Sequence, residues 1–166
     1  MKRAIVALLL VTYALLEKRP GYGIYYGLAK LTGSRLDIGP VDWSRLTRHE
    51  TPNDTLVCPA GRCLNAIPDW EPKTYPMPAS ELLARLKKIA LAEPDTNELS
   101  CEPNCARTAR FLQLTRLMRY PDTIDIEVFP AGDNQSTLAI YSRSLIGRGD
   151  MGVNRARVTR WLAALG

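Results

Sequence analysis

Several features are absent from this chain of 166 residues, and each absence removes a class of protein. No run of 18 apolar residues occurs, which excludes a protein with several membrane-spanning helices. No glycine period or low-complexity tract occurs, and 46% of the residues are apolar, so a fibrous or wholly disordered chain is excluded as well. The length corresponds to one domain, because domains typically hold about 100–200 residues. One small folded domain remains.

Signatures of catalysis are also scarce. The sequence holds a single histidine, His49, and no G-x-S-x-G, H-E-x-x-H or glycine-rich phosphate-loop pattern. The carboxylates of Asp122 and Asp125 fall on a predicted turn and on a predicted solvated strand face, where they would only be hydrated. We therefore expect no enzyme, no cofactor and no metal site. The remaining catalytic alternative is a hydrolase that uses Ser142 or Ser144, with His49 within hydrogen-bond reach as its base.

The N-terminus carries a short apolar run between charges. Lys2 and Arg3 precede the apolar residues 4–16, and the charged residues 17–19 end the run. As a helix these residues span about 20 Å, less than a hydrocarbon core of about 30 Å. A charged start before an apolar stretch of this length is typical of an export signal. Small-x-small cleavage motifs lie only inside the run or far beyond it, which favours an uncleaved anchor over a removed signal; a buried helix of a cytosolic domain is the alternative.

This run predicts three parts in the chain: a membrane anchor or signal segment at 1–19, a juxtamembrane segment at 20–52 and a globular domain at 53–166. The tyrosines Tyr22, Tyr25 and Tyr26 follow the run, where aromatic rings favour the membrane–water interface. We expect a single-pass protein of the inner membrane, with residues 4–16 in the lipid bilayer and the globular domain in the periplasm.

Four cysteines form two close groups, Cys58 with Cys63 and Cys101 with Cys105. Behind an export-like segment they predict two disulfides in an oxidising compartment. Local pairing closes loops of about six residues, worth on the order of 2 kcal/mol each, and pairing between the groups closes loops of over about 40 residues. Both connectivities fit the sequence. A four-thiolate zinc site and free thiols are alternatives, although the spacing is looser than the C-x2-C pattern of zinc knuckles.

Hydrophobic periodicity predicts the elements of the globular domain. Apolar residues at helical spacing predict a helix over 79–92, and a second helix of about 14 residues follows a capping Asp150. Alternation predicts strands at 96–100, 106–117, 123–129 and 135–144, with a short edge strand at 75–77 and ordered loop elsewhere in 53–78. The expected fold is α+β, a four-stranded antiparallel sheet with two helices on one face in β-α-β4-α order, preceded by an N-terminal hydrophobic helix. This order resembles TATA-binding-protein-like folds in topology alone, which implies no DNA binding.

Positive charge gathers at the two ends of the chain. The formal net charge is +5, and the nine basic residues of 107–166 are all arginine, against five acidic residues. Arginine suits bidentate contact with carboxylate or phosphate. In an exported domain this favours anionic lipid headgroups or an acidic protein face, and we expect no nucleic-acid partner. Ion pairs with the local acids are the plainer interpretation.

One polar group of residues stands out near the C-terminus. Asn154 lies four residues before Val158 and so points along the buried stripe of the last helix. An inward polar group must find partners or costs about 1–3 kcal/mol, and strand-end hydroxyls or the loop around Gly149 are the expected partners. The structural interpretation is a polar network at the helix start, and the functional one is a notch for a small anion or a partner. The candidate binding residues are Ser142, Arg143, Ser144, Arg148, Asp150, Asn154 and Arg157.

Four runs resemble the domain-of-unknown-function family numbered 1499. They are PNDTLVCPAG at 52–61, RYPDT at 119–123, YSRS at 141–144 and GRGDMGVNRAR at 147–157, and the likeness covers about 45–165. Similar members are typically small bacterial proteins with an N-terminal hydrophobic segment. The resemblance implies no established activity, so no catalytic residue is carried over, and Cys101 with Cys105 lies outside the family pattern.

These features favour a non-catalytic, membrane-anchored accessory subunit that docks on a larger membrane protein complex. A span shorter than the bilayer is seated more easily against other helices than in bare lipid. The alternative is a binding module for a small anion or lipid headgroup, centred on Arg143, Arg148 and Arg157.

Overall fold

The computed structural model describes residues 37, 39–48, 50–101, 105–116 and 120–166. The predicted membrane anchor, most of the predicted juxtamembrane segment and His49 lie outside these residues, and so does the predicted N-terminal helix. Within the described ranges, every helix is too short or too polar to cross a bilayer.

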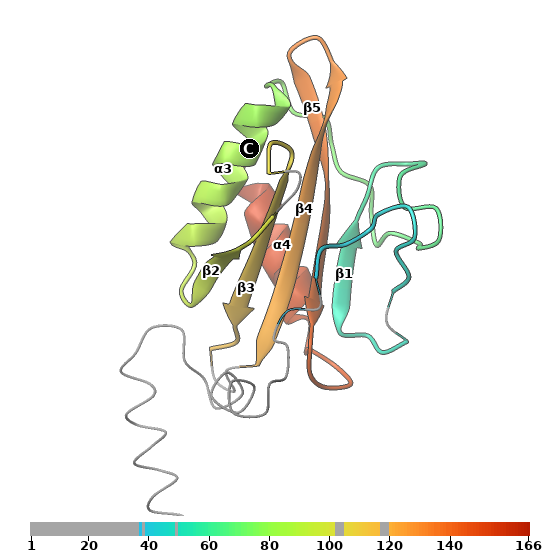
Figure 1. Ribbon diagram of the computed structural model, residues 1–166, viewed down its shortest axis with the longest axis vertical. Coiled ribbons are helices and arrows are strands. Elements are labelled where there is room, and N and C mark those ends of the chain that lie inside the picture. The colour runs from blue at the N-terminus through green and yellow to red at the C-terminus, as the bar shows by residue number, and fades with distance from the viewer. Residues whose placement is uncertain (1–36, 38, 49, 102–104, 117–119) are drawn as a thin grey trace, which may run out of the picture.

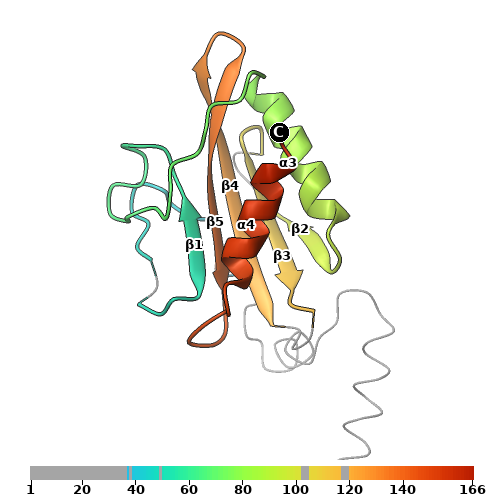
Figure 2. The same cartoon turned by 180° about the vertical axis from the view of Figure 1, so that it is seen from behind.

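The described chain forms one five-stranded antiparallel sheet with the strand order β1-β5-β4-β3-β2. The helices α3 and α4 both cover the same face of this sheet, behind it in Figure 1 and in front of it in Figure 2. We call the face of the sheet that the helices cover the helix face, and the opposite face the open face. The elements are β1 (Asp54–Val57), α3 (Ala79–Ala92), β2 (Thr96–Leu99), β3 (Thr108–Leu114), β4 (Pro121–Gly132), β5 (Gln135–Ser144) and α4 (Val153–Ala163).

The expectation of a four-stranded sheet is wrong, because β1 adds a fifth strand. β1 holds only four residues between Asn53 and a cysteine, so its sequence reads as loop, and its place is set by antiparallel pairing with β5, from Asp54 opposite Arg143 to Val57 opposite Ile140. The predicted edge strand at 75–77 contributes only an isolated bridge between Tyr75 and Ser136.

The main core lies between the sheet and the two helices. Strand alternation points Ile124, Ile126 and Val128 of β4 toward the helices, and all three are fully or almost fully buried. The apolar stripe of α3 and the residues Val158 and Trp161 of α4 pack against them. This burial of apolar area is the main stabilising term for both helices.

A second, smaller core covers part of the open face. Trp43 and Leu46 pack there against Leu56 and Tyr141, together with the cysteines at 58 and 63. The segment 41–46 is therefore packed against the globular domain, although its sequence shows few signs of regular secondary structure.

We predict that Leu86→Ala lowers the free energy of unfolding by about 2–5 kcal/mol, because the substitution leaves a cavity at a fully buried position of α3. The matched control is Leu91→Ala on the same helix, where the side chain is 48% exposed, and its cost should stay within about 0.5 kcal/mol. Chemical denaturation measures both. Similar losses for the two variants would contradict the assigned core face.

Candidate functional site

Polar side chains gather on the helix face at the end of the sheet where β5 leads into α4. Gln113, Asp122 and Ser144 lie opposite one another on β3, β4 and β5, in register across the three strands. Because side chains two residues apart share a face, Ser142 joins them. The buried polar cluster comprises Gln113, Asp122, Ser142, Ser144, Asn154 and Arg157.

Arg157 is the centre of the buried polar cluster, and only 1% of it is exposed. Its Nη2 donates to Oδ2 of Asp122 at 2.7 Å, and its Nη1 donates to Oγ of Ser142 at 2.8 Å and to Oδ1 of Asn154 at 2.6 Å. Its Nε donates to the side-chain oxygen of Gln113. One guanidinium thus joins β3, β4 and β5 to α4 through charge-assisted hydrogen bonds.

Asn154 connects the cluster to the rest of the fold. Its Oδ1 accepts from Ser142 at 2.6 Å, and its Nδ2 donates to Oγ of Ser144 and to the carbonyl of Asn53, both at 3.0 Å. Its backbone N–H donates to the Asp150 carboxylate at 2.7 Å. The helix begins after Gly152, so Asp150 is not its N-cap residue, but its carboxylate also accepts the N–H of Gly152 at 3.0 Å.

The electrostatics of the buried polar cluster are those of an enclosed ion pair. Asp122 is fully buried, and this burial raises the pKa of its carboxyl, while the charge and hydrogen bond of Arg157 oppose the rise. The expectation that Asp122 and Asp125 are merely solvated is wrong. Asp125 is 3% exposed, because residue 37 and residues 39–48 cover the open face at that point.

Arg143 belongs to a different group of charges. Alternation along β5 turns its side chain to the open face, where Nε donates to Oγ1 of Thr123 at 3.2 Å and Nη2 lies 3.6 Å from Oδ2 of Asp125. Arg110 donates to the other oxygen of Asp125 at 2.8 Å and also binds Asp37. Burial alone would raise the pKa of Asp37, and the hydrogen bond and charge of Arg110 bring that pKa below its usual value.

The structure therefore divides the seven candidate binding residues. Five of them, Ser142, Ser144, Asp150, Asn154 and Arg157, form one connected network on the helix face. Arg143 lies on the open face, with the sheet between it and Arg157. Arg148 is exposed in the loop between β5 and α4. A single anion site built from Arg143, Arg148 and Arg157 stays a prediction, and the described geometry gives these three side chains no common space.

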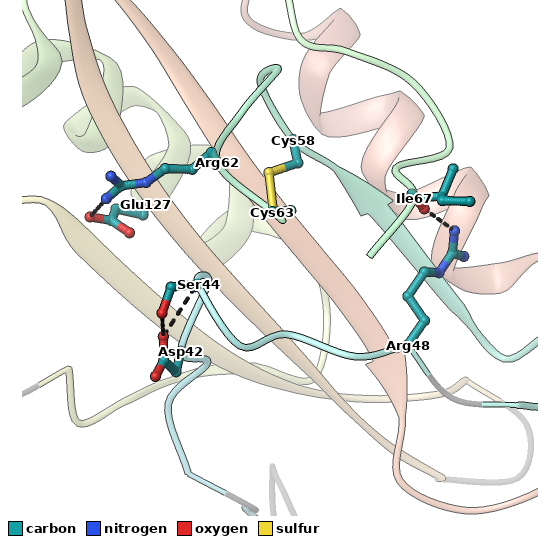
Figure 3. Close-up of a disulfide and its surroundings, with 8 residues drawn as sticks. All are labelled: Asp42, Ser44, Arg48, Cys58, Arg62, Cys63, Ile67 and Glu127. Atoms are coloured by element: carbon teal, nitrogen blue, oxygen red, sulfur yellow. Dashed lines mark hydrogen bonds and ion pairs between the residues drawn. A yellow bond between two sulfur atoms is a disulfide. The ribbon is translucent and has the colours of Figure 1, made fainter. Parts of the chain in front are cut away.

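Both disulfides are present, and each is local. Cys58 is bonded to Cys63, and Cys101 to Cys105. All four cysteines are described and none is free. This excludes the crossed pairing, the zinc site and the free thiols. Figure 3 shows the first disulfide between two polar contacts, one from Arg62 and one from Arg48.

The first disulfide supports a protruding segment, here called the disulfide loop, residues 58–68. Leu64 and Ile67 of this loop are 72% and 85% exposed. The loop is nevertheless held in place, because Arg62 bonds Glu127 at 3.1 Å and Arg48 donates to the carbonyl of Ile67 at 3.1 Å (Figure 3). Two large aliphatic side chains are thus presented to solvent on a fixed backbone.

Surface hollows lie on both sides of the disulfide loop. The first has a volume of about 550 Å³ and is lined by Arg48, residues 50–52, Asp54 and residues 65–69. The second has a volume of about 450 Å³ and is lined by residues 41–44, residues 61–62, Leu64 and Glu127. Together the linings hold five carboxylates and two guanidiniums. Asp42 and Glu50 are exposed, whereas Asp54 and Glu127 are nearly buried in ion pairs with Arg48 and Arg62. The lining carboxylates are Asp42, Glu50, Asp54, Asp69 and Glu127.

The polar group behind the first hollow was not found from the sequence. Nη2 of Arg48 lies 2.6 Å from Asp54 and 3.0 Å from Asp69, and the hydroxyl of Tyr141 donates to Asp54 at 2.6 Å. Burial raises the pKa of Tyr141, and the neighbouring Asp54 carboxylate raises it further. Up to 87 residues of sequence separate these partners, so no local pattern announces the group.

Glu93, at the end of α3, joins the two helices. Its carboxylate accepts from Nη2 of Arg160 at 3.0 Å and from the indole N–H of Trp161 at 3.1 Å. It also accepts from Gln113 of the buried polar cluster at 3.3 Å. Burial by itself would raise the pKa of Glu93, but Arg160 first and then Trp161 and Gln113 hold that pKa below its usual value of 4.5.

We predict that Arg157→Met lowers the free energy of unfolding by about 3–5 kcal/mol, because the Asp122 carboxylate is left buried without its charge partner. The double variant Arg157→Met/Asp122→Leu should recover part of this loss, since both charges are then gone. Arg155→Met, whose side chain is 65% exposed, is the control and should cost less than about 1 kcal/mol. Denaturant unfolding gives all three values. A double variant no more stable than Arg157→Met alone would refute the role of the uncompensated charge.

We predict that Glu93→Gln lowers the free energy of unfolding by about 0.5–1 kcal/mol near pH 7, a modest amount because Arg160 is half exposed. The Glu93 pKa is depressed in the folded protein, so its contribution is present above pH 4.5 and is lost as the pH falls through the lower folded value. Denaturation of both proteins across pH 3–7 measures the difference between them. A difference that grows toward low pH would contradict the assignment.

Comparison with known proteins places the chain in a family without assigning it an activity. No curated protein matches the sequence. The family described as "Protein of unknown function (DUF1499)" matches residues 47–165, a range that includes β1, the disulfide loop, the buried polar cluster and both helices. The family predicted from the sequence motifs is thereby confirmed. The chain belongs to the DUF1499 family.

Proposed function

We propose that this protein is a non-catalytic accessory subunit, tethered to the inner membrane with its folded domain in the periplasm, which docks on a larger membrane protein assembly. The observation that carries the proposal is the disulfide loop, which presents Leu64 and Ile67 to solvent beside two hollows whose linings include five carboxylates. Exposed apolar surface rimmed by polar residues marks protein–protein contact sites.

The two disulfides support the periplasmic part of the proposal. Disulfides persist in oxidising compartments and are rare in the cytosol. Each of the two closes a short loop, of sequence separation 5 and 4. The apolar run at 4–16 supports the tether, since it follows two basic residues and ends in charge.

The use of the buried polar residues supports a non-catalytic role. The side chains of Ser142, Asn154 and Arg157 bond one another at 2.6–2.8 Å, and all three are fully or almost fully buried. A nucleophile and its base need access to a reacting atom of the substrate. The hydrolase alternative further needs His49, which lies outside the described residues.

The chemistry of the disulfide loop indicates the kind of partner surface. The linings of the hollows beside Leu64 and Ile67 hold five carboxylates and two guanidiniums, and Arg45 and Arg155 lie within 4.0 Å of Asp42 and Asp69. A complementary surface carries an apolar side chain flanked by lysine or arginine. An anionic membrane surface is a poor match for this part of the molecule.

We predict that the full chain, extracted from its native membrane in mild detergent, runs in native mass spectrometry as a complex heavier than one chain. The double variant Leu64→Ser/Ile67→Ser should run largely as the free chain, because the exposed apolar contacts of the disulfide loop are lost. The control is Leu91→Ser, which removes a 48% exposed leucine from α3 and should leave the complex intact. Iodoacetamide should label no thiol of the unreduced protein.

Three outcomes would count against the proposal. A wild-type chain that is strictly monomeric at native abundance refutes docking. A double variant that keeps the complex refutes the assigned surface. Reduced cysteines in the native protein refute the compartment.

A further inference from the structure

The loop between β5 and α4, residues 145–152, exposes apolar side chains at one end of the sheet. Met151, near the end of the loop, is fully exposed, and Ile146 of the loop and Val153, the first residue of α4, are 37% and 38% exposed. Arg148 is exposed within the same loop. Figure 1 shows this loop at the lower end of the sheet, where β5 ends and β4 begins. The loop thus presents a fully exposed apolar side chain three residues from an exposed cation.

The backbone of this loop is fixed in a conformation that disfavours an ordinary side chain. Met151 has a φ of 53° and the next residue, Gly152, a φ of 77°, both in the left-handed region. Residues with a Cβ atom rarely adopt this region, and such strain persists only where the surroundings enforce it. Methionine therefore stands, fully exposed, at a position where glycine or asparagine would be less strained.

Hydrogen bonds from neighbouring residues hold the loop in this conformation. The carboxylate of Asp150 accepts the N–H groups of Gly152 and Asn154, at 3.0 and 2.7 Å. The side chain of Asn53 donates to the carbonyl of Gly147 at 2.9 Å. Asn154 is itself held in the buried polar cluster. The cluster and its ion pair thus act through Asp150 and Asn154 to set the shape of an exposed apolar loop.

The first described residues of the chain lie near the strand end that leads into this loop. The carbonyl of Gly39, near the start of the described chain, accepts from Arg143 at 3.5 Å, one residue before the end of β5. The first described residues thus lie on the open face, Asp37 at Arg110 of β3 and Gly39 at Arg143 of β5, and Arg143 precedes the loop by two residues. On this same end, Arg116 is exposed in the connection from β3 to β4.

We infer that the loop at 145–152 contacts the surface of the membrane, with Met151 among the lipid at the interface and Arg148 against anionic headgroups. Apolar side chains that enter the headgroup region and a neighbouring cation together give such contacts their strength. The inference rests on the proposed membrane tether, which supplies a high local concentration of lipid, so that a weak contact is sufficient. It assigns the lipid contact to this loop and leaves the disulfide loop for the protein partner.

Charge distinguishes the two surfaces. The loop at 145–152 carries Arg148 and Asp150, and the Asp150 carboxylate is used by backbone amides of the loop itself. The hollows beside the disulfide loop carry an excess of carboxylates. Arg148, with Arg116 exposed at the same end of the sheet, supplies the positive charge that anionic lipid attracts, whereas the exposed Asp42 and Glu50 beside the disulfide loop do not favour such a contact.

The test places a reporter on the loop of the full chain. Every native cysteine is in a disulfide, so Met151→Cys supplies a single thiol for an environment-sensitive fluorophore. The labelled chain is reconstituted in nanodiscs of phosphatidylcholine alone or with phosphatidylglycerol. With phosphatidylglycerol we expect a blue-shifted emission and at least about twofold quenching by spin-labelled lipid. The matched control is Ile67→Cys on the disulfide loop, which is 85% exposed and should remain unquenched.

A second variant tests the role of Arg148. In the labelled Met151→Cys chain, Arg148→Gln should reduce the quenching in phosphatidylglycerol discs to the level seen in phosphatidylcholine discs. Arg85→Gln, at an exposed arginine of α3, should leave the quenching unchanged. Equal quenching for Arg148→Gln and its parent would overturn the contact with anionic headgroups.

The remaining outcomes separate this inference from the proposed function. If the chain is retained in the discs but the label at position 151 shows no blue shift and no quenching, the lipid contact is refuted and the proposed tether is not. Equal quenching at 151 and 67 overturns the assignment to this loop. A chain that is not retained in the discs overturns the tether and the lipid contact together.

Discussion

The ion pair between Arg157 and Asp122 is the contact on which the arrangement of this domain depends. Both side chains are removed from water, so each needs the other and the polar groups around it. Arg157 comes from α4, whereas Asp122, Ser142 and Gln113 come from three neighbouring strands. A helix packed by apolar contacts alone has several nearly equivalent positions, and a guanidinium with this set of acceptors specifies one of them.

The same pair links the interior to the surface. The side-chain oxygen of Asn154 accepts a hydrogen bond from Arg157, and the backbone N–H of Asn154 donates to the Asp150 carboxylate. Those bonds hold the left-handed turn at Met151. The motif at 147–157 therefore combines interior residues that maintain a conformation with exterior residues that are displayed by it. This division of roles supports an interaction role better than a catalytic one, because the interior polar groups are used in supporting the fold.

The two faces of the sheet are covered by different kinds of structure. The helix face is closed by α3 and α4 over a continuous apolar core. The open face is covered in part by residues near the start of the described chain and by the disulfide loop, with charges between them such as Arg110 and Asp125. An antiparallel sheet with one face under helices and one face under irregular segments allows both a stable core and variable surface loops.

The sequence by itself determined the helix at 79–92, the alternating strands at 123–129 and 135–144, and the family, since each rests on a pattern within a short stretch of chain. It also indicated that Asn154 is directed inward. Only the tertiary structure decided that Asp54–Val57 is a strand, that both disulfides are local and that Arg143 and Arg157 lie on opposite faces of the sheet. The physical reason is that pairing between distant segments sets these features. A four-residue strand has no period of its own to show, and the strand partners of Arg157, which are Ser142, Asp122 and Gln113, lie 15, 35 and 44 residues away along the chain.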